Sequence, residues 1–195
     1  MQQLLIITPV KDSIDHTVRT MEAVVQSELN VPHRYVVFND NSTPENTARL
    51  HTEAARLGVE VVDLATLTDH PSPNYLFVLR RCRKEALADD AGLLIVESDV
   101  TVQRDTLQKL FDGATARPNC GIAAAVTVDE EGKINYPYLY ARGKEGQDYD
   151  CKKHCSFCCS LLTPALLKAC DFDRLDDSKN WFDVTISHDS LAAGL

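Results

Sequence analysis

The sequence lacks any long apolar run and is poor in basic residues. Its 195 residues include 20 lysines and arginines against 29 aspartates and glutamates, so the formal net charge is −9 at pH 7. This acidic balance argues against a broad nucleic-acid or anionic-membrane surface. No stretch approaches the roughly 18 consecutive apolar residues of a membrane-spanning helix. We therefore expect the partner to be a small molecule.

The amino terminus also lacks the features of a secretory signal. Met1–Gln3 carries no basic side chain, and Leu4–Ile7 is too short for the apolar core of a signal peptide. The seven cysteines, an odd number, favour reduced thiols over a disulfide framework. We expect a cytoplasmic protein with one globular domain over residues 1–195, and a homo-oligomer stays open.

Short apolar runs alternate with helical patterns in the first half of the chain. Buried strands are predicted at Leu4–Ile7, Tyr35–Phe38, Val59–Val62 and Leu93–Val96. Pro9 is expected to end the first of them, because proline cannot donate to a central ladder. Amphipathic helices are predicted between the strands. This alternation predicts an α/β fold with a parallel sheet covered on both faces.

The second half of the chain is less regular. Thr101–Asp105 leads into a predicted helix that runs through Phe111, and Gly121–Val128 predicts a strand of small apolar residues. Asp129–Lys133 indicates a hairpin turn that leads into another strand, Ile134–Tyr140.

Polar residues follow three of the predicted strands. Glu97-Ser98-Asp99 comes directly after Leu93–Val96, and its two carboxylates would share one side of an extended backbone. Thr8-Pro9 follows the first strand, and Asn39–Thr43 follows the second. Because the ends of parallel strands meet at one edge, these clusters are expected to line a single crevice. Paired carboxylates there predict a divalent cation holding a phosphate; alternatively, they mark only the start of a solvated loop.

With this pattern the sequence resembles the family 2 glycosyltransferases, which have the GT-A fold. The matching segments are Ile7-Thr8-Pro9-Val10 for the opening strand and loop, Phe38–Thr43 for D-D-x-S-T, Glu97-Ser98-Asp99 for D-x-D and Phe182-Asp183 for E-D. The resemblance is strong over roughly the first hundred residues and weak beyond them. It implies a Rossmann-like, mostly parallel sheet, with a nucleotide-binding half over about 1–100 and an acceptor-side half over about 101–195.

The resemblance implies metal-dependent, inverting transfer of a glycosyl group from a nucleoside-diphosphate sugar to a saccharide or other hydroxyl acceptor. Asp99, helped by Glu97, would hold Mn²⁺ or Mg²⁺ against the diphosphate and so supply Lewis-acid catalysis. Asp183 would be the general base, although a carboxylate that begins a helix often only complements the helix dipole. His188 is a further candidate metal ligand, and its alternative role is that of a surface histidine.

The same resemblance implies a nucleotide-binding set, which comprises Thr8, Pro9, Asp40, Arg81 and Ser98. Asp40 would accept a hydrogen bond from the base. Arg81 or its neighbour Arg80 could face the diphosphate, which a guanidinium binds well. The basic cluster Arg80–Lys84 is equally typical of a solvated helix face.

Departures from the family pattern keep other functions open. Asn39, Glu97 and Phe182 each replace an acid of the family motifs, and the chain is short for the family. A degenerate GT-A domain that binds a nucleotide or a partner without turnover is therefore the alternative. A sugar nucleotidyltransferase should open with a glycine-rich loop, yet Thr8–Asp12 contains no glycine. A phosphoacceptor signalling domain should carry a lysine at the end of a later strand. Here the predicted strand 121–128 is followed by three acidic residues, 129–131.

Cysteines gather between residues 151 and 159. Cys151 and Cys155 lie four positions apart, and Cys155 with Cys158 matches a C-x-x-C knuckle, so a structural zinc is chemically feasible. The segment Cys158–Leu162 also reads as a strand in which small thiols fill space. The sequence leaves both interpretations open.

Overall fold

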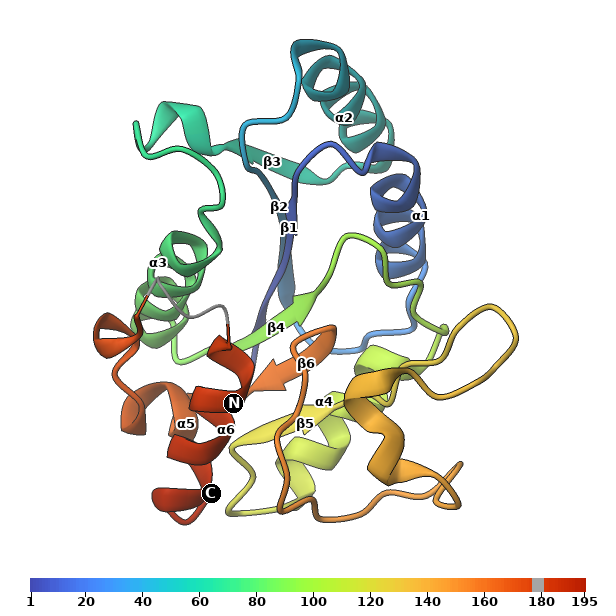
Figure 1. Ribbon diagram of the computed structural model, residues 1–195, viewed down its shortest axis with the longest axis vertical. Coiled ribbons are helices and arrows are strands. Elements are labelled where there is room, and N and C mark those ends of the chain that lie inside the picture. The colour runs from blue at the N-terminus through green and yellow to red at the C-terminus, as the bar shows by residue number, and fades with distance from the viewer. Residues whose placement is uncertain (177–180) are drawn as a thin grey trace.

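A six-stranded sheet with the order β3-β2-β1-β4-β6-β5 organises the chain. The computed structural model describes residues 1–176 and 181–195 (Figure 1). The strands are β1 (Leu4–Val10), β2 (His33–Asn39), β3 (Glu60–Asp63), β4 (Gly92–Val96), β5 (Ile122–Ala124) and β6 (Cys159–Leu162). β1 to β4 are mutually parallel, whereas β6 runs antiparallel to both β4 and β5. The predicted α/β class and mostly parallel sheet are confirmed.

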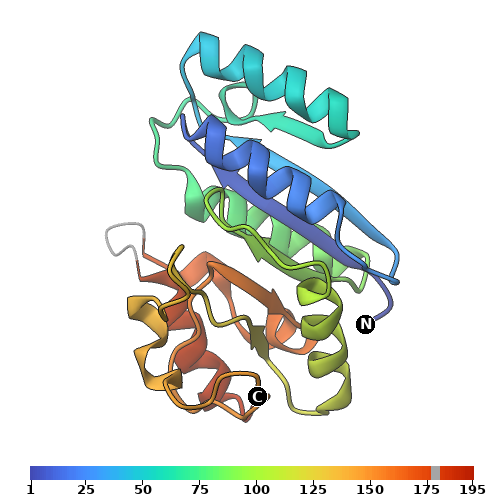
Figure 2. The same cartoon turned by 90° about the vertical axis from the view of Figure 1, so that its right-hand side faces the viewer.

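Helices cover both faces of this sheet. They are α1 (Ile14–Val25), α2 (Pro44–Leu57), α3 (Tyr75–Ala88), α4 (Thr106–Ala116), α5 (Pro164–Ala169) and α6 (Phe182–Ala192). α1, α2 and α4 lie on one face, the one turned to the viewer in Figure 2, and α3, α5 and α6 lie on the other. No helix among the described residues is long and apolar enough to cross a membrane.

The two-sided covering explains why β4 is apolar without a break. Leu93 and Ile95 join the cluster under α3 and α5, whereas Leu94 and Val96 join the cluster against α4. All four side chains are fully buried. Successive residues of a strand point to opposite faces, so a strand between two helical layers needs apolar residues at every position.

The expectation that Pro9 ends the first strand is wrong, because β1 continues to Val10. β4 pairs with β1 only as far as Ile7, which lies opposite Ile95. The Asp40 amide donates to the Val10 carbonyl at 2.8 Å, so the backbone polar groups of Val10 face β2. Those of Pro9 face the opposite side, where β4 no longer runs beside β1. No ladder bond is required there, and proline is tolerated.

The predicted hairpin in the second half shrinks to a single bridge between Val128 and Ile134. The turn between them forms, since the Gly132 amide donates to the Asp129 carbonyl at 3.0 Å. The expected long strand at 121–128 is only β5, and the expected strand at 134–140 is a 3-10 segment, η2 (Tyr136–Ala141). Tyr136 and its neighbours have the composition of a strand, but none of the described strands lies beside them to complete a ladder.

Candidate active site at the carboxyl ends of the parallel strands

The three polar clusters predicted from the sequence lie at one edge of the sheet, because β1, β2 and β4 are parallel neighbours. The loops after β1 and β2 are also bonded to each other. Asp12, with a φ of +58°, accepts hydrogen bonds from the Thr43 amide at 2.7 Å and from Asn46 at 3.0 Å. The Asp12 amide in turn donates to Ser42 Oγ at 2.9 Å. These bonds fix the edge at which a ligand is expected.

Asp40 holds a neighbouring segment of the chain in place. Its carboxylate accepts hydrogen bonds from Ser72 Oγ at 2.8 Å, from the Asn74 amide at 2.7 Å and from Asn74 Nδ2 at 2.7 Å. The side chain is buried, with 8% exposure. Asp40 therefore positions Pro73 and the start of α3, a role that the sequence did not indicate.

The negative charges of Glu97 and Asp99 repel each other. The prediction of an extended backbone between them is wrong. The Val100 amide donates to the Glu97 carbonyl at 3.0 Å, so the chain turns immediately after β4 and carries Ser98 on the turn. Burial raises the pKa of the Glu97 carboxyl, and the negative charges of Asp99 and Asp183 raise it further. Two acids from the end of β4 and one from the start of α6 are thus gathered in one place.

A cavity of about 270 Å³ lies at this meeting point. Its lining consists of Pro73, Tyr75, Glu97, Ser156, Phe157, Phe182 and Asp183. The rings of Tyr75 and Phe182 stack with their centroids 6.1 Å apart and an interplanar angle of 17°. Glu97 and Asp183, which are 86 positions apart in the sequence, therefore face a common space with aromatic walls.

Sequence reasoning missed Tyr75 in this cavity. Its hydroxyl is buried and has no hydrogen-bond partner among the described residues. One signal could have indicated its position. Because α3 leads into β4, the helix must begin at the edge where the parallel strands end, and Tyr75 is its first residue.

The residues predicted after the first strand make different contributions. The Thr8 side chain is fully buried, and its hydroxyl lies 2.9 Å from the hydroxyl of Tyr35 on β2. The whole residue is 0% exposed, so neither the side chain nor the backbone of Thr8 is open to a nucleotide, and the predicted contact of Thr8 with a nucleotide is not supported. Pro9 is partly buried at the end of β1.

The arginines of α3 do not point to the carboxyl edge of the sheet. Arg80 donates to the carbonyl oxygens of Phe172, Asp173 and Leu175, at 3.0, 3.2 and 2.8 Å, and Arg83 donates to that of Leu167 at 2.9 Å. The solvated-face interpretation is therefore wrong for these two.

Arg81 is exposed, and its charge acts on Glu60, the first residue of β3. The hydrogen bond from Arg34 is the main cause that lowers the pKa of Glu60, and Arg81 adds to it. The structure thus places Arg81 toward the amino end of the strands, away from Asp40 and Glu97.

His188 lies on an exposed part of α6, five residues after Asp183. Five residues correspond to a rotation of about 140° around the axis of an α-helix. The two side chains therefore leave the helix in different directions. Asp183 itself lies in the first turn, where Oδ1 accepts the Val184 amide at 2.8 Å, so it also fits the alternative role of complementing the helix dipole.

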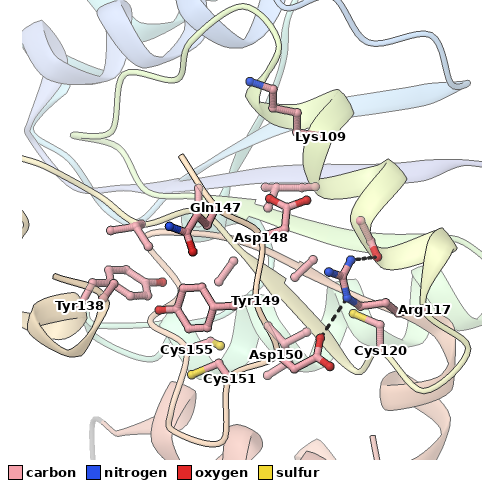
Figure 3. A pocket seen from close by; sticks show the side chains of 18 of the residues that line it. Lys109, Arg117, Cys120, Tyr138, Gln147, Asp148, Tyr149, Asp150, Cys151 and Cys155 are labelled. Atoms are coloured by element: carbon pink, nitrogen blue, oxygen red, sulfur yellow. Dashed lines mark hydrogen bonds and ion pairs between the residues drawn. The ribbon is translucent and has the colours of Figure 1, made fainter. Parts of the chain in front are cut away.

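Two of the clustered cysteines line a second cavity. This larger cavity of about 1150 Å³ lies between α4, β5 and the segment 144–155, and the thiols of Cys151 and Cys155 lie beside one another in it (Figure 3). Burial is the main cause that raises the pKa of the Cys158 thiol; the hydrogen bond with Ser156 lowers it, and the charges of Glu97, Asp99 and Asp183 raise it further. No group of three or more His, Cys, Asp or Glu side chains in the described part of the chain has a metal-binding arrangement.

Comparisons with known proteins add a structural finding. No protein-family model and no curated protein matches the sequence. Solved structures do match. A mannosyltransferase from Pyrobaculum calidifontis, PcManGT in complex with GDP-Man and Mn²⁺, superposes with a TM-score of 0.64 at 16% identity, covering 97% of this chain and 51% of that one. The chain has the GT-A fold.

Two further GT-A structures agree with this assignment. TarS 1–349 from S. aureus, in complex with UDP-GlcNAc, gives a TM-score of 0.63 at 14% identity and covers 98% of this chain and 54% of its own. Glucosyl-3-phosphoglycerate synthase from Mycobacterium tuberculosis, in complex with Mn²⁺, UDP and glucosyl-3-phosphoglycerate, gives 0.53 at 15% identity and covers 86% and 59%. The present chain thus spans about half the length of these GT-A proteins.

Proposed function

We propose that this protein transfers a glycosyl group, with inversion, from a nucleoside-diphosphate sugar to a hydroxyl acceptor. The observation that carries the proposal is the gathering of Glu97, Asp99 and Asp183 beside a 270 Å³ cavity at the carboxyl edge of a GT-A sheet. The solved relatives that bind GDP-Man and UDP-GlcNAc support a nucleotide sugar as donor.

The residues at the end of β4 fit a divalent cation. Hard cations take oxygen ligands, and Mg²⁺ in particular is often held by one or two carboxylates together with substrate phosphates. Glu97 and Asp99 would supply the two carboxylates. When bound, Mn²⁺ or Mg²⁺ would neutralise the charge that develops on the leaving nucleoside diphosphate.

Asp183 is the proposed general base. It lines the cavity opposite Glu97, and a carboxylate there can accept the proton of an acceptor hydroxyl as that oxygen attacks the sugar. The aromatic walls of Tyr75, Phe157 and Phe182 would keep water from the reacting centre.

The nucleotide would lie along the loops after β1 and β2. The partly buried Pro9 and the turn residue Ser98 are the proposed contacts, and Asp40 would act by holding Pro73 in the wall of the site. Arg81 lies near Glu60, away from this edge, and His188 lies on an exposed face of α6. We therefore propose no contact of either residue with the nucleotide or the metal.

Calorimetric titration with UDP and GDP, with and without Mn²⁺, tests the proposal. We expect binding that requires Mn²⁺ and disappears in Asp99→Asn. Asp183→Asn should keep nucleotide binding but reduce turnover by about 10²–10⁴-fold, as for loss of a general base. Asp189→Asn, which changes an exposed acid on the same helix, is the matched control and should leave both unchanged.

Two results would count against the enzyme. If neither nucleotide binds under any of these conditions, the proposed site is wrong. If a nucleotide binds but the wild type shows no donor hydrolysis or transfer, the chain is the degenerate GT-A binder that its altered motifs left open. If the wild type is active and Asp183→Asn is equally active, Asp183 is not the general base.

A further inference from the structure

Two thiols of the cysteine cluster have no part in the proposed reaction. Cys151 and Cys155 are free, and both line the cavity of about 1150 Å³, where their sulfurs lie beside one another (Figure 3). Burial is the main cause that raises the pKa of the Cys155 thiol to about 12, and the charge and the hydrogen bond of Cys151 come next, ahead of the charge of Cys120. Cys151 is therefore the thiol that acts most strongly on Cys155.

This pair of thiols suits a disulfide better than a metal site. Structural zinc takes four ligands. In the part of the chain that the structure describes, no group of three or more His, Cys, Asp or Glu side chains could hold a metal ion. A disulfide needs only two sulfurs that can approach to about 2 Å. Cys151 and Cys155 belong to a segment without helix or strand, so no regular backbone holds them apart.

The Cys155 side of the pair is firmly held. Its amide donates to Ser187 Oγ of α6 at 3.0 Å. The carbonyl of the preceding residue accepts the Tyr140 hydroxyl at 2.7 Å, and the carbonyl of the following residue accepts the Tyr138 hydroxyl at 2.8 Å. The segment η2 and the helix α6 therefore fix the backbone around Cys155 from two sides.

Cys151 lies on the more accessible side. Residues 142–150, which lead to it, form no helix or strand, and all of them except Tyr149 are exposed. The Cys151 sulfur accepts the Lys153 amide at 3.3 Å, and the adjacent Lys152 and Lys153 are exposed. Their ammonium groups favour the approach of an anionic reagent. Such a reagent therefore meets Cys151 first.

We propose that Cys151 and Cys155 form a reversible disulfide by exchange with a low-molecular-weight disulfide, and that this bond fastens segment 142–151 to the fixed backbone around Cys155. The Cys151 thiolate attacks the reagent, whose S–S bond breaks; a mixed disulfide forms, and the first thiol leaves with the proton that Cys151 lost. The Cys155 sulfur then loses its proton, attacks the Cys151 sulfur and displaces the second thiol. The two protein thiols lose two electrons and two protons, and the reagent gains them.

The order of the two steps follows from the surroundings of each sulfur. With a pKa of about 12, the Cys155 thiol is protonated at neutral pH and is a poor first nucleophile. Once Cys151 carries the reagent's sulfur, it is no longer charged and has no proton to share. The two causes that Cys151 adds to the raised pKa of Cys155 then disappear. The second attack is also intramolecular, which favours it over attack by another molecule.

Exchange with oxidised glutathione, an anionic disulfide, tests the pair in the whole chain. Alkylation of the remaining thiols and chymotrypsin cleavage after Tyr149 and Phe157 give the peptide 150–157, which contains Cys151 and Cys155 and no other cysteine. From oxidised protein this peptide should lack two hydrogen atoms and carry no alkyl group, and dithiothreitol should reverse the change. Recovery of the peptide with both thiols alkylated would overturn the proposal.

Three variants assign the roles of the thiols. Cys155→Ser should stop at the mixed disulfide and accumulate a peptide that carries one glutathione. Cys151→Ser should react at residue 155 at least about tenfold more slowly than the wild type reacts at residue 151, because the Cys155 thiol is protonated. Cys120→Ser is the matched control: Cys120 lines the same cavity, and its loss should leave the rate of bond formation unchanged.

Two results with these variants would contradict the assignment. If Cys120→Ser no longer forms the bond, the partner of Cys155 is Cys120. If the wild type accumulates the mixed disulfide as Cys155→Ser does, Cys155 does not resolve it. Either result overturns the proposed pair.

Trypsin cleavage of the native protein measures the fastening of the segment. Lys152 and Lys153 lie within the ring that the bond closes, so cleavage after them should be about threefold or more slower in oxidised than in reduced protein. Cys151→Ser, treated with the same reagent, should be cleaved at one rate. Equal rates for oxidised and reduced wild type would show that the bond restrains nothing.

The inference does not rest on the proposed function. Peptide masses and cleavage rates are measured without nucleotide, sugar or metal, so a failure of UDP or GDP to bind leaves both tests valid. The backbone that follows Cys155 also lines the 270 Å³ cavity through Ser156 and Phe157. The bond would thus join the wall of the larger cavity to that of the candidate active site.

Discussion

Glu97 is an acid of the candidate site whose pKa is raised by its surroundings. It follows the fully buried β4, and burial is the first cause that raises its pKa above 4.5, followed by Asp99 and Asp183. A carboxyl whose pKa rises on folding stabilises the protein below its unfolded pKa, and this stabilisation is lost as the pH rises through the folded pKa. The ionised Glu97 carboxylate is therefore destabilised by folding at neutral pH.

Glu97→Gln should relieve this destabilisation. We expect the variant to be more stable than the wild type at pH 7.5, with a difference that shrinks toward zero as the pH falls to 4.5, because the wild-type carboxyl is then neutral as well. Thermal unfolding from pH 4.5 to 8 measures the effect.

Glu60→Gln is a control of opposite sign. Glu60 pairs with Arg34 at 2.7 Å, and its pKa is lowered chiefly by that hydrogen bond. Its replacement should destabilise the protein at neutral pH and lose its effect as the pH falls. Parallel pH profiles for Glu97→Gln and the wild type would contradict the crowding of acids at the end of β4.

The sequence indicated where several site residues lie better than it indicated what their side chains bind. Glu97, expected at the strand edge, and Asp183, assigned through the family resemblance, line one cavity. Asp40 lies at the expected edge, but its carboxylate is engaged by Ser72 and Asn74. The partner of a polar side chain depends on which distant segment folds against it, and the local sequence does not contain that information.

Among the elements, helix α2 has the clearest local signals. Thr43 Oγ1 accepts the Asn46 amide at 3.3 Å, Pro44 occupies the first turn, and Gly58 follows the last turn with a φ of +69°. These are the residues that N-caps, first turns and left-handed C-caps favour. The local sequence therefore marks both ends of α2.

Two substitutions of glycine by alanine should have opposite effects. Gly58→Ala should lower the free energy of unfolding by about 1 kcal/mol, because its left-handed backbone disfavours a Cβ although the surrounding space is open. Gly113→Ala, in the interior of α4, should raise it by roughly 0.5–1 kcal/mol, since the nearest atom to the new Cβ is 3.9 Å away. Urea denaturation measures both. A destabilised Gly113→Ala would contradict the helical conformation at this position.

The same reasoning explains why the second half was predicted less well. α2 ends on signals within its own sequence, whereas η2 contains strand-forming tyrosines and no such stop. A strand also requires a neighbour, and β5, the last strand of the sheet, pairs with β6 alone. Local propensity cannot supply the missing partner.

At the scale of the whole molecule, the two halves of the chain share their cores. The cluster under α3 includes Leu5 and Ile7 from the first strand and Ile186 from the last helix. On the other face, Leu161 of β6 packs with Leu4, Ile6 and Leu94. The nucleotide-binding and acceptor-side halves implied by the family resemblance are therefore expected to unfold together.

Leu161→Ala tests this coupling. The side chain is fully buried, and its truncation should cost about 2–5 kcal/mol. Urea unfolding should remain a single transition, with far-UV circular dichroism and the fluorescence of Trp181, the one tryptophan of the sequence, giving coincident curves. Leu191→Ala, at a position 41% exposed, is the control and should change stability by less than about 0.5 kcal/mol. Separate transitions for the two signals would mean that the halves fold independently.

The sequence by itself determined the layered architecture, the bounds of the well-capped helices and the edge at which the acidic residues collect. It did so because periodicity, capping and strand polarity are local properties that survive in any fold. Only the tertiary structure decided that Asp40 holds Asn74, that Arg80 is bonded to η3 (Phe172–Arg174), and that the buried hydroxyl of Tyr75 has no hydrogen-bond partner among the described residues. Each of these depends on contacts between segments about 30 or more positions apart, and the packing of the helices on the sheet sets those contacts.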